Sequence, residues 1–331
     1  MTTRVITRRS IVTAALLGAA ALLAGTTACA AADVYPSRPV RIIIGFAPGS
    51  GTDLTARMIA QELQKALGQP FVVENRPGAA VQIAANLVKA AAPDGYTLLL
   101  TSNSSHSVNP HVFKTLSYDP VADFTPIGGV ASLPFVVAVN GDLPVKTLPE
   151  LVTWSRANKG NVFYGYSGTV FRVPGETLNL SQQLGATAVP FKSSPDAMTE
   201  VIAGRVQFLV VDLASSQAQL TAKRLRALAV TSAKRSALAP ELPTVEEALG
   251  VTDFDMAAWT GLFGPANLPK PIVAKLNGVM LKSLERPDLR QRMLAANLEP
   301  MPMETPAFAA MVRQQLKSWG VKVREAGIEP E

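Results

Sequence analysis

Residues 40–54 read VRIIIGFAPGSGTDL, and this stretch predicts how the fold begins. Residues 40–46 form a run rich in β-branched side chains, which is typical of a strand buried on both faces. Helically spaced apolar residues follow at once, with Asp53 as the N-cap or a first-turn residue and Gly68 as the stop. A buried strand that passes through glycines into a helix is the opening unit of a parallel α/β sheet.

The alternation of strand and helix continues along the chain. Strands are predicted at 71–74, 96–101, 127–139, 162–164, 188–191, 206–211, 225–231 and 257–263, and helices at 81–91, 147–157, 175–184, 196–203, 215–222, 272–285, 287–296 and 305–325. Thr147-Leu148-Pro149-Glu150 is interpreted as a capping box that opens one of these helices. The pattern predicts an α/β protein with two doubly wound parallel sheets.

The two halves of the chain are not separated by a Gly/Ser linker. We therefore expect the chain to cross between the sheets twice, near residues 130 and 254. The first lobe is predicted to comprise 33–130 and 255–331, and the second lobe 131–254. A hinge made of two strands would let both lobes open and close as rigid bodies around a cleft.

The first thirty residues have the pattern of a secretory signal peptide: three arginines, an apolar run at 11–23 and then small residues. The apolar run is shorter than the roughly 20 residues that a spanning helix needs, so we expect residues 1–32 to be cleaved and the protein exported. Arg8-Arg9 leaves both twin-arginine and general secretory export open. Lipidation at Cys29 stays open as a further alternative.

Composition is that of a soluble globular protein, with 48% hydrophobic and 17% charged residues. Without the three arginines of the signal peptide, 28 Lys and Arg remain against 25 Asp and Glu, a net charge of +3. We expect no nucleic-acid partner, and we interpret the basic run at 223–226 as a solvated edge. The exported chain has no cysteine, which excludes disulfides and thiol chemistry.

Ligands of open α/β sheets bind beyond the carboxyl ends of the strands, where helix N-termini present unpaired N–H groups. The first such loop, residues 46–53, contains glycines that let the backbone approach an anion closely. It has no Gly-Lys-Ser/Thr, and Leu54 stands where a dinucleotide loop has its third glycine, so a nucleotide site is not favoured. A tight turn without any ligand is the alternative interpretation.

Further candidate ligand-binding loops follow later strands. Their hydroxyl and amide side chains can donate to a carboxylate without carrying charge. The alternative for each is a local cap or turn. Asp212 is expected either to accept from a ligand or to cap the next helix, and Arg172 either to reach a carboxylate or to face solvent. The predicted ligand-binding residues are Pro48, Gly49, Ser50, Gly51, Asp53, Ser102, Asn103, Ser167, Gly168, Thr169, Ser193 and Asp212.

Catalytic and metal-binding patterns are missing from the sequence. Gly165-Tyr166-Ser167-Gly168 is not the Gly-x-Ser-x-Gly elbow of a nucleophile. His106 and His111 are the only histidines, and neither has flanking carboxylates that would complete a metal site. We expect both to lie at the surface or in loops, and we expect no enzyme activity, metal or cofactor.

Motifs spread over nearly all of the exported chain resemble those of the substrate-binding proteins of tripartite tricarboxylate transporters, the Bug/TctC family. In chain order they are Tyr35-Pro36-Ser37-Arg38-Pro39-Val40, Pro48-Gly49-Ser50-Gly51-Thr52-Asp53, Ala56-Arg57, Glu74-Asn75-Arg76-Pro77-Gly78-Ala79, Pro93-Asp94-Gly95-Tyr96-Thr97-Leu98, Asn109-Pro110, Leu225-Arg226-Ala227-Leu228-Ala229-Val230-Thr231, Pro243-Thr244-Val245 and Trp259-Thr260-Gly261-Leu262. One such match alone is weak, whereas the whole ordered set is specific.

The resemblance implies a Venus-flytrap fold of the periplasmic binding protein type 2, with two α/β lobes and no catalysis. It implies a periplasmic, monomeric receptor that captures a small carboxylated solute for membrane transporter subunits. Family members hold the carboxylate through backbone N–H groups, hydroxyls and ordered waters, which on this chain fall on 48–53, on Ser102 and its neighbours, and on 167–169. A ligand-dependent sensor, or a hydrolase or transferase using the same cleft, are the alternatives.

The chain departs from the family pattern at several of these loops. Ser50 replaces the second glycine of a common Gly-Gly pair. The loop at 164–176 is shorter than usual and carries Val170-Phe171-Arg172 in place of small polar residues and a histidine. Lys192-Ser193-Ser194 and Val211-Asp212 replace Lys-Gly-Gly and Asp-Asn. The identity of the ligand therefore cannot be carried over from a relative.

Overall fold

A computed structural model of the chain describes residues 35–331. The chain divides into two units, Met1–Ser37 and Arg38–Glu331, and only residues 35–37 of the first unit are described. The predicted signal peptide at 1–32 lies outside the described residues.

The first sheet has the strand order β11-β4-β10-β3-β1-β2. Its strands are β1 (Val40–Ile44), β2 (Phe71–Asn75), β3 (Thr97–Ser102), β4 (Phe124–Leu133), β10 (Ala258–Pro265) and β11 (Glu299–Pro300). Strands β1, β2 and β3 are parallel, whereas β10 runs antiparallel to β3 and β4. The predicted α/β fold with two sheets is confirmed, but the first sheet is mixed rather than parallel, because β10 returns from the second sheet in the opposite direction.

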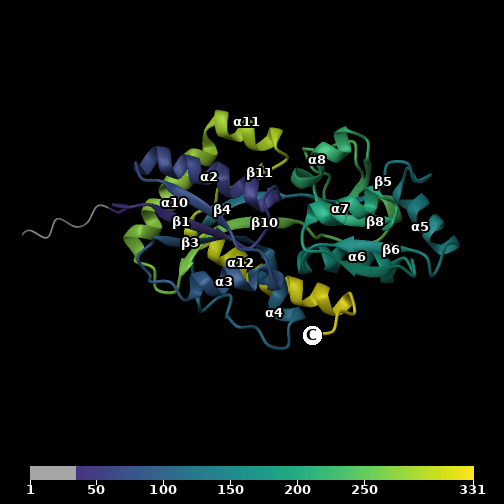
Figure 1. Cartoon of the computed structure of the whole chain (residues 1–331), viewed down its shortest axis with the longest axis horizontal. Helices are drawn as coiled ribbons and strands as arrows, with labels where there is room; N and C mark the ends of the chain where they lie inside the picture. The colour runs from purple at the N-terminus through teal and green to yellow at the C-terminus, as the bar shows by residue number, and fades with distance from the viewer. Residues whose placement is uncertain (1–34) are drawn as a thin grey trace, which may run out of the picture. The chain divides into compact units, whose positions relative to one another are not determined.

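The second sheet has the order β7-β6-β8-β5-β9. Its strands are β5 (Phe135–Asn140), β6 (Phe163–Tyr166), β7 (Thr187–Pro190), β8 (Phe208–Asp212) and β9 (Leu225–Val230). Strand β6 pairs in parallel with β7 and β8, and β5 pairs antiparallel to β8 and β9. In Figure 1 the first sheet is grouped with α2, α10, α11 and α12, and the second with α5 to α8.

Two connections join the sheets, as a hinged two-lobe fold requires. The first is Pro134, which separates β4 from β5, so the single strand-like stretch predicted at 127–139 is two strands in different sheets. The second runs from the end of β9 to the start of β10, where the Met256 N–H donates to the Thr231 carbonyl at 2.8 Å. The exact lobe limits near residues 130 and 254 stay a prediction.

The helices are α2 (Gly51–Leu67), α3 (Gln82–Lys89), α4 (Asn109–Val112), α5 (Leu148–Ala157), α6 (Thr169–Ser181), α7 (Ser194–Ile202), α8 (Leu213–Thr221), α9 (Val245–Leu249), α10 (Lys270–Glu285), α11 (Pro287–Ala295) and α12 (Thr305–Glu325), with a short 3₁₀ turn η1 (Ala79–Val81) and a π-helical turn η2 (Ser104–Val108). Thr147 caps α5 as predicted, but the Glu150 carboxylate accepts from the Lys146 N–H, so the capping box is not reciprocal. A reciprocal box instead opens α9, and it was not predicted from the sequence.

Each sheet has an apolar core of its own. Ile43, Leu99 and Phe263 are buried in the first, and Val136 and Leu209 in the second. Separate cores allow each lobe to move as a rigid body. Within the described residues, every helix is too short or too polar to cross a bilayer.

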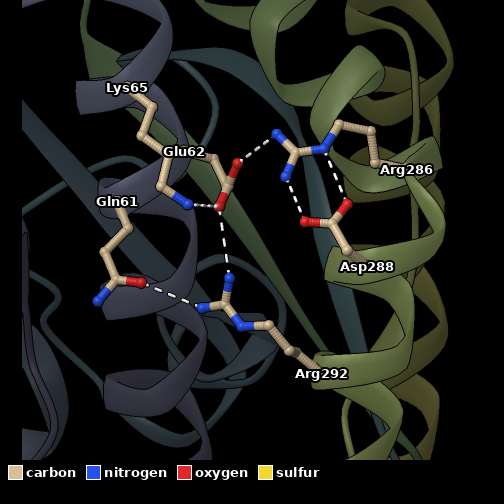
Figure 2. Close-up of polar contacts among 6 residues, drawn as sticks. All are labelled: Gln61, Glu62, Lys65, Arg286, Asp288 and Arg292. Carbon is tan, nitrogen blue, oxygen red and sulfur yellow. Dashed lines mark hydrogen bonds and ion pairs between the residues drawn. The ribbon is translucent and has the colours of Figure 1, made fainter.

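Helix α2 is anchored to the rest of its lobe by a buried carboxylate (Figure 2). The Glu62 side chain is only 1% exposed. It forms ion pairs with Lys65 at 2.8 Å, with Arg286 at 2.8 Å and with Arg292 at 3.5 Å. Because Arg286 and Arg292 belong to the α10–α11 region, these contacts hold α2 against the rest of its lobe.

Candidate functional site

Loops from both lobes enclose a cavity of about 730 Å³. Its size lies within the range of small-molecule sites. The lining residues from the first lobe are Gly45, Phe46, Ala47, Ser50, Pro77, Gly78, Ala79, Ala80, Val81, Ser104, Phe113 and Glu331, and those from the second lobe are Tyr166, Ser167, Gly168, Thr169, Arg172, Pro190, Phe191, Lys192, Ser193, Ser194 and Asp196.

The N-caps of three helices line this cavity. Ser50 caps α2 and accepts from the Asp53 N–H, Ser193 caps α7 and accepts from the Asp196 N–H, and Gly168 is the N-cap of α6. Each helix N-terminus carries about half a positive charge and unpaired N–H groups. Helix ends from both lobes therefore make the cavity favourable for an anion.

Ser104 supplies a buried hydroxyl that has no hydrogen-bond partner among the described residues. It is 2% exposed, belongs to η2 and lines the cavity. A buried hydroxyl without a partner is unfavourable, so such a group inside a cavity points to a ligand. From the sequence, Ser102 and Asn103 of this hydroxyl-rich loop were predicted to bind the ligand and Ser104 was not; the π-helical turn that buries Ser104 at the cavity wall has no clear sequence signal.

Asp53 supports the first loop from behind and does not line the cavity. Its carboxylate accepts from the Gly49 N–H at 3.0 Å and from Asn75 Nδ2 at 3.0 Å, and it forms an ion pair with Arg57 at 2.9 Å. Burial alone would raise the pKa of Asp53, but these hydrogen bonds outweigh it and hold the pKa below its usual range. Pro48 and Gly49 are exposed and also lie outside the cavity lining.

Gly51 and Asp212 meet at the contact between the lobes rather than in the cavity. A Cβ atom at Gly51 would lie 2.6 Å from Asp212 Oδ1 and 2.5 Å from Leu133 Cδ2. Asp212 caps α8 by accepting from the N–H and the hydroxyl of Ser215, and burial raises the pKa of Asp212. With Ser102 these residues line a space of about 20 Å³, which has room for about one water molecule.

The remaining predicted residues separate into two groups. Ser167 and Thr169 line the cavity, where Ser167 shares a hydrogen bond with Ser194 at 2.8 Å. The Thr169 hydroxyl donates to Asn109 Oδ1 at 2.8 Å and so links the two lobes. Asn103 lies outside the cavity lining and donates through Nδ2 to the Ala257 carbonyl at 3.3 Å.

The expectation of a surface or loop position is wrong for His106. This side chain is fully buried in η2 and stacks on Phe263 with a centroid distance of 4.0 Å. Burial lowers the pKa of His106 to about 3, so the ring is neutral. His111 is half-buried and shares a 2.7 Å hydrogen bond with the Leu316 carbonyl. Among residues 35–331, no cluster of His, Cys, Asp or Glu has the makeup of a metal site.

The family model described as "Tripartite tricarboxylate transporter family receptor" (TctC) matches residues 55–328. BugT of Bordetella pertussis is 30% identical over 316 residues, covering 95% of this chain and 97% of BugT. A UPF0065 protein of Bordetella bronchiseptica is 33% identical over 317 residues, covering 95% of this chain and 93% of the relative.

Solved structures show the same fold. Rpa4515 of R. palustris with adipate has a TM-score of 0.87 at 32% identity, covering 90% of this chain and 100% of that chain. The periplasmic binding protein BugD has a TM-score of 0.83 at 31% identity, with the same coverage. MatC of Rhodopseudomonas palustris with bound malate has a TM-score of 0.81 at 31% identity, covering 87% and 100%.

Proposed function

This chain belongs to the tripartite tricarboxylate transporter receptor family, and on that premise we propose that it captures a small organic carboxylate in the cavity between its lobes. The solute is then handed to membrane subunits of a transporter of the tripartite type. The carboxylate-bound relatives, one with adipate and one with malate, support this class of ligand.

One observation carries the proposal: N-caps from both lobes converge on one cavity together with the unpartnered hydroxyl of Ser104. A carboxylate accepts from helix N–H groups and from a hydroxyl at the same time, and charge-assisted hydrogen bonds are stronger than neutral ones. A single helix end contributes about 0.3–1 kcal/mol, whereas micromolar binding needs about 8 kcal/mol. Several donors must therefore act together.

Closure of the lobes supplies these donors. Ser50 and Ser104 come from the first lobe, and Gly168 and Ser193 from the second, so the full set surrounds a ligand only when the lobes are together. The close contact of Gly51 with Asp212 and the hydrogen bond from Thr169 to Asn109 hold this closed arrangement. The ligand binds the closed state more tightly and shifts the population towards it.

We propose that the signal peptide at residues 1–32 directs the protein to the periplasm, where it acts as a monomer. The name of BugD as a periplasmic binding protein supports this location. The close likeness to a family of receptors favours binding without catalysis over the sensor and enzyme alternatives.

A thermal-unfolding screen against mono-, di-, tricarboxylic and aromatic acids tests the proposal. At about 100 times its dissociation constant, a ligand adds about 2.7 kcal/mol to the free energy of unfolding and raises the Tm. The neutral amide of each acid is the matched control and is expected to leave the Tm unchanged. Stabilisation by the amides to the same extent, or by none of the acids, would contradict carboxylate capture.

A further inference from the structure

Arg172 places a half-buried cation in the cavity wall of the second lobe. It lies in the first turn of α6, and its side chain is 24% exposed. Its guanidinium lies over the ring of Tyr166, 5.8 Å from the centroid. Lys192, the other cation of the lining, is exposed. Arg172 is therefore the lining cation that is best shielded from water.

A glutamate from the opposite lobe is paired with this cation. Glu331 Oε1 lies 2.9 Å from Arg172 Nη1. The backbone of Glu331 is attached to the first lobe, since its N–H donates to the Val112 carbonyl and its carbonyl accepts from the Lys114 N–H. The ion pair therefore joins the two lobes at the cavity.

The two partners are held very differently. The Glu331 side chain is 70% exposed, so it can move into water at little cost in free energy. Arg172, in contrast, is packed into the cavity wall. Exposed ion pairs of this kind contribute only about 0–1 kcal/mol. The guanidinium also has five N–H donors in a planar fork that fits both oxygens of a carboxylate, and the contact with Glu331 engages Nη1.

We propose that Arg172 is a specificity-determining residue that binds a second carboxylate of the ligand, and that Glu331 occupies this position until such a ligand displaces it. This inference rests on the proposed function, because it concerns the far end of a ligand held in the same cavity. A dicarboxylate exchanges one carboxylate for another at Arg172, so no buried charge is left unpaired.

The walls of the cavity indicate what joins the two carboxylates. Phe46 and Phe113 of the first lobe and Phe191 of the second line the cavity. Apolar walls suit a hydrocarbon middle of the ligand and reduce the screening of charges by water. The ligand class assigned to this cavity is therefore a dicarboxylate with an apolar aliphatic or aromatic spacer.

A monocarboxylate leaves the pair of Arg172 and Glu331 intact, so its affinity does not depend on either side chain. A dicarboxylate gains the fork of Arg172 and competes with Glu331. Removing Arg172 should therefore weaken dicarboxylates selectively, and removing the charge of Glu331 should strengthen them selectively. These opposite effects distinguish a binding role from a merely structural ion pair, in which both changes would act alike.

Isothermal titration of the full chain with matched acids tests this inference. The probes are succinate, adipate and sebacate, each against the monocarboxylate of equal length, and terephthalate against benzoate. For the dicarboxylate that binds best, Arg172→Gln is expected to weaken binding about tenfold or more while its monocarboxylate changes by less than about twofold. Glu331→Gln is expected to strengthen the same dicarboxylate about two- to fivefold.

Controls come from the exposed pair of Arg205 and Glu200 on the second lobe, outside the cavity lining. Arg205→Gln and Glu200→Gln change the net charge equally and are expected to leave both acids unaffected. Arg172→Lys keeps the charge without the fork and is expected to fall between wild type and Arg172→Gln. It also keeps the test open if Arg172→Gln does not fold, which thermal unfolding reports.

Two results would overturn the inference alone: equal weakening of mono- and dicarboxylates in the Arg172 variants, or weaker dicarboxylate binding in Glu331→Gln. In both cases the wild type still binds acids, so carboxylate capture survives. If the wild type binds no acid of either kind, the proposed function is contradicted, and so is the inference that Arg172 binds a second carboxylate.

Discussion

Helix α2 contains two buried carboxylates, Asp53 near its N-terminus and Glu62 in its second half. Their side chains are 4% and 1% exposed, and both form ion pairs with arginine. The partners of Asp53 come from its own loop, its own helix and the adjacent β2, whereas Arg286 and Arg292 reach Glu62 from more than two hundred residues along the chain. One carboxylate shapes a loop beside the cavity, and the other fixes the helix in the lobe.

The difference teaches that similar burial and pairing serve separate purposes at the two ends of one helix. Changes near the N-terminus of α2 should alter ligand binding with only a small effect on stability, and changes near Glu62 should alter stability without altering ligand binding. The following changes test this separation, beginning with the largest expected effect.

Gly51→Leu should weaken binding of the best acid at least about a hundredfold, equivalent to about 2.7 kcal/mol. The added side chain would collide with Asp212 and Leu133 and hold the lobes apart. Gly278→Leu on α10 is the matched control, because a Cβ there meets no atom within 4 Å. Titration calorimetry measures both variants, and unchanged affinity in Gly51→Leu would refute the role of this contact in closure.

Glu62→Ala should lower the free energy of unfolding by about 1–3 kcal/mol, less than the 3–5 kcal/mol typical of a fully buried pair. The reduction is smaller because Arg286 and Arg292 are partly exposed and water screens the charges left behind. Urea denaturation measures the loss. Ligand affinity should stay within about twofold of wild type, and a loss of affinity beyond the loss of folded protein would break the separation between the two ends.

Ser104→Ala should weaken carboxylate binding about tenfold, because it removes a donor to a charged ligand. The free protein should keep its stability or gain slightly, since the substitution removes a buried hydroxyl that has no hydrogen-bond partner within residues 35–331. Calorimetry measures the affinity for the carboxylate, and thermal unfolding measures the stability of the free protein. A less stable protein with unchanged affinity would assign Ser104 to the scaffold instead of the site.

Asp53→Asn should have the smallest effect of these substitutions. It should lower the free energy of unfolding by an amount that depends on pH. Because the pKa of Asp53 is lowered in the folded protein, its ionised form stabilises the fold above the usual carboxyl pKa of about 4, and this contribution is lost as the pH falls through the folded value. The difference in free energy of unfolding between wild type and variant should therefore shrink from pH 7 towards pH 3. A difference that stays constant with pH would mean that ionisation of Asp53 does not contribute to the stability of the fold.

Local signals explain why α2 could be predicted well from the sequence. Its apolar spacing and the stop at Gly68 are features of adjacent residues, and Gly68 adopts the left-handed conformation at the C-cap. The break at Pro134 and the antiparallel direction of β10 depend on which sheet each strand joins, so periodicity did not reveal them.

The candidate site was less predictable because its residues meet only in the folded chain. The loops around Ser50 and 167–169 follow strands and were found by that rule. Arg172 and Glu331 are separated by 159 residues, and the burial of Ser104 and His106 results from a π-helical turn packed by other elements. Such placements depend on tertiary contacts that a residue pattern does not contain.

A crystal structure of the protein with the tightest-binding acid tests the central claim most directly. We expect one carboxylate inside the cavity, with its oxygens about 2.5–3.2 Å from Ser104 Oγ and from backbone N–H groups at the starts of α2, α6 or α7. An acid bound elsewhere, or a carboxylate inside the cavity that contacts none of these donors, would contradict it.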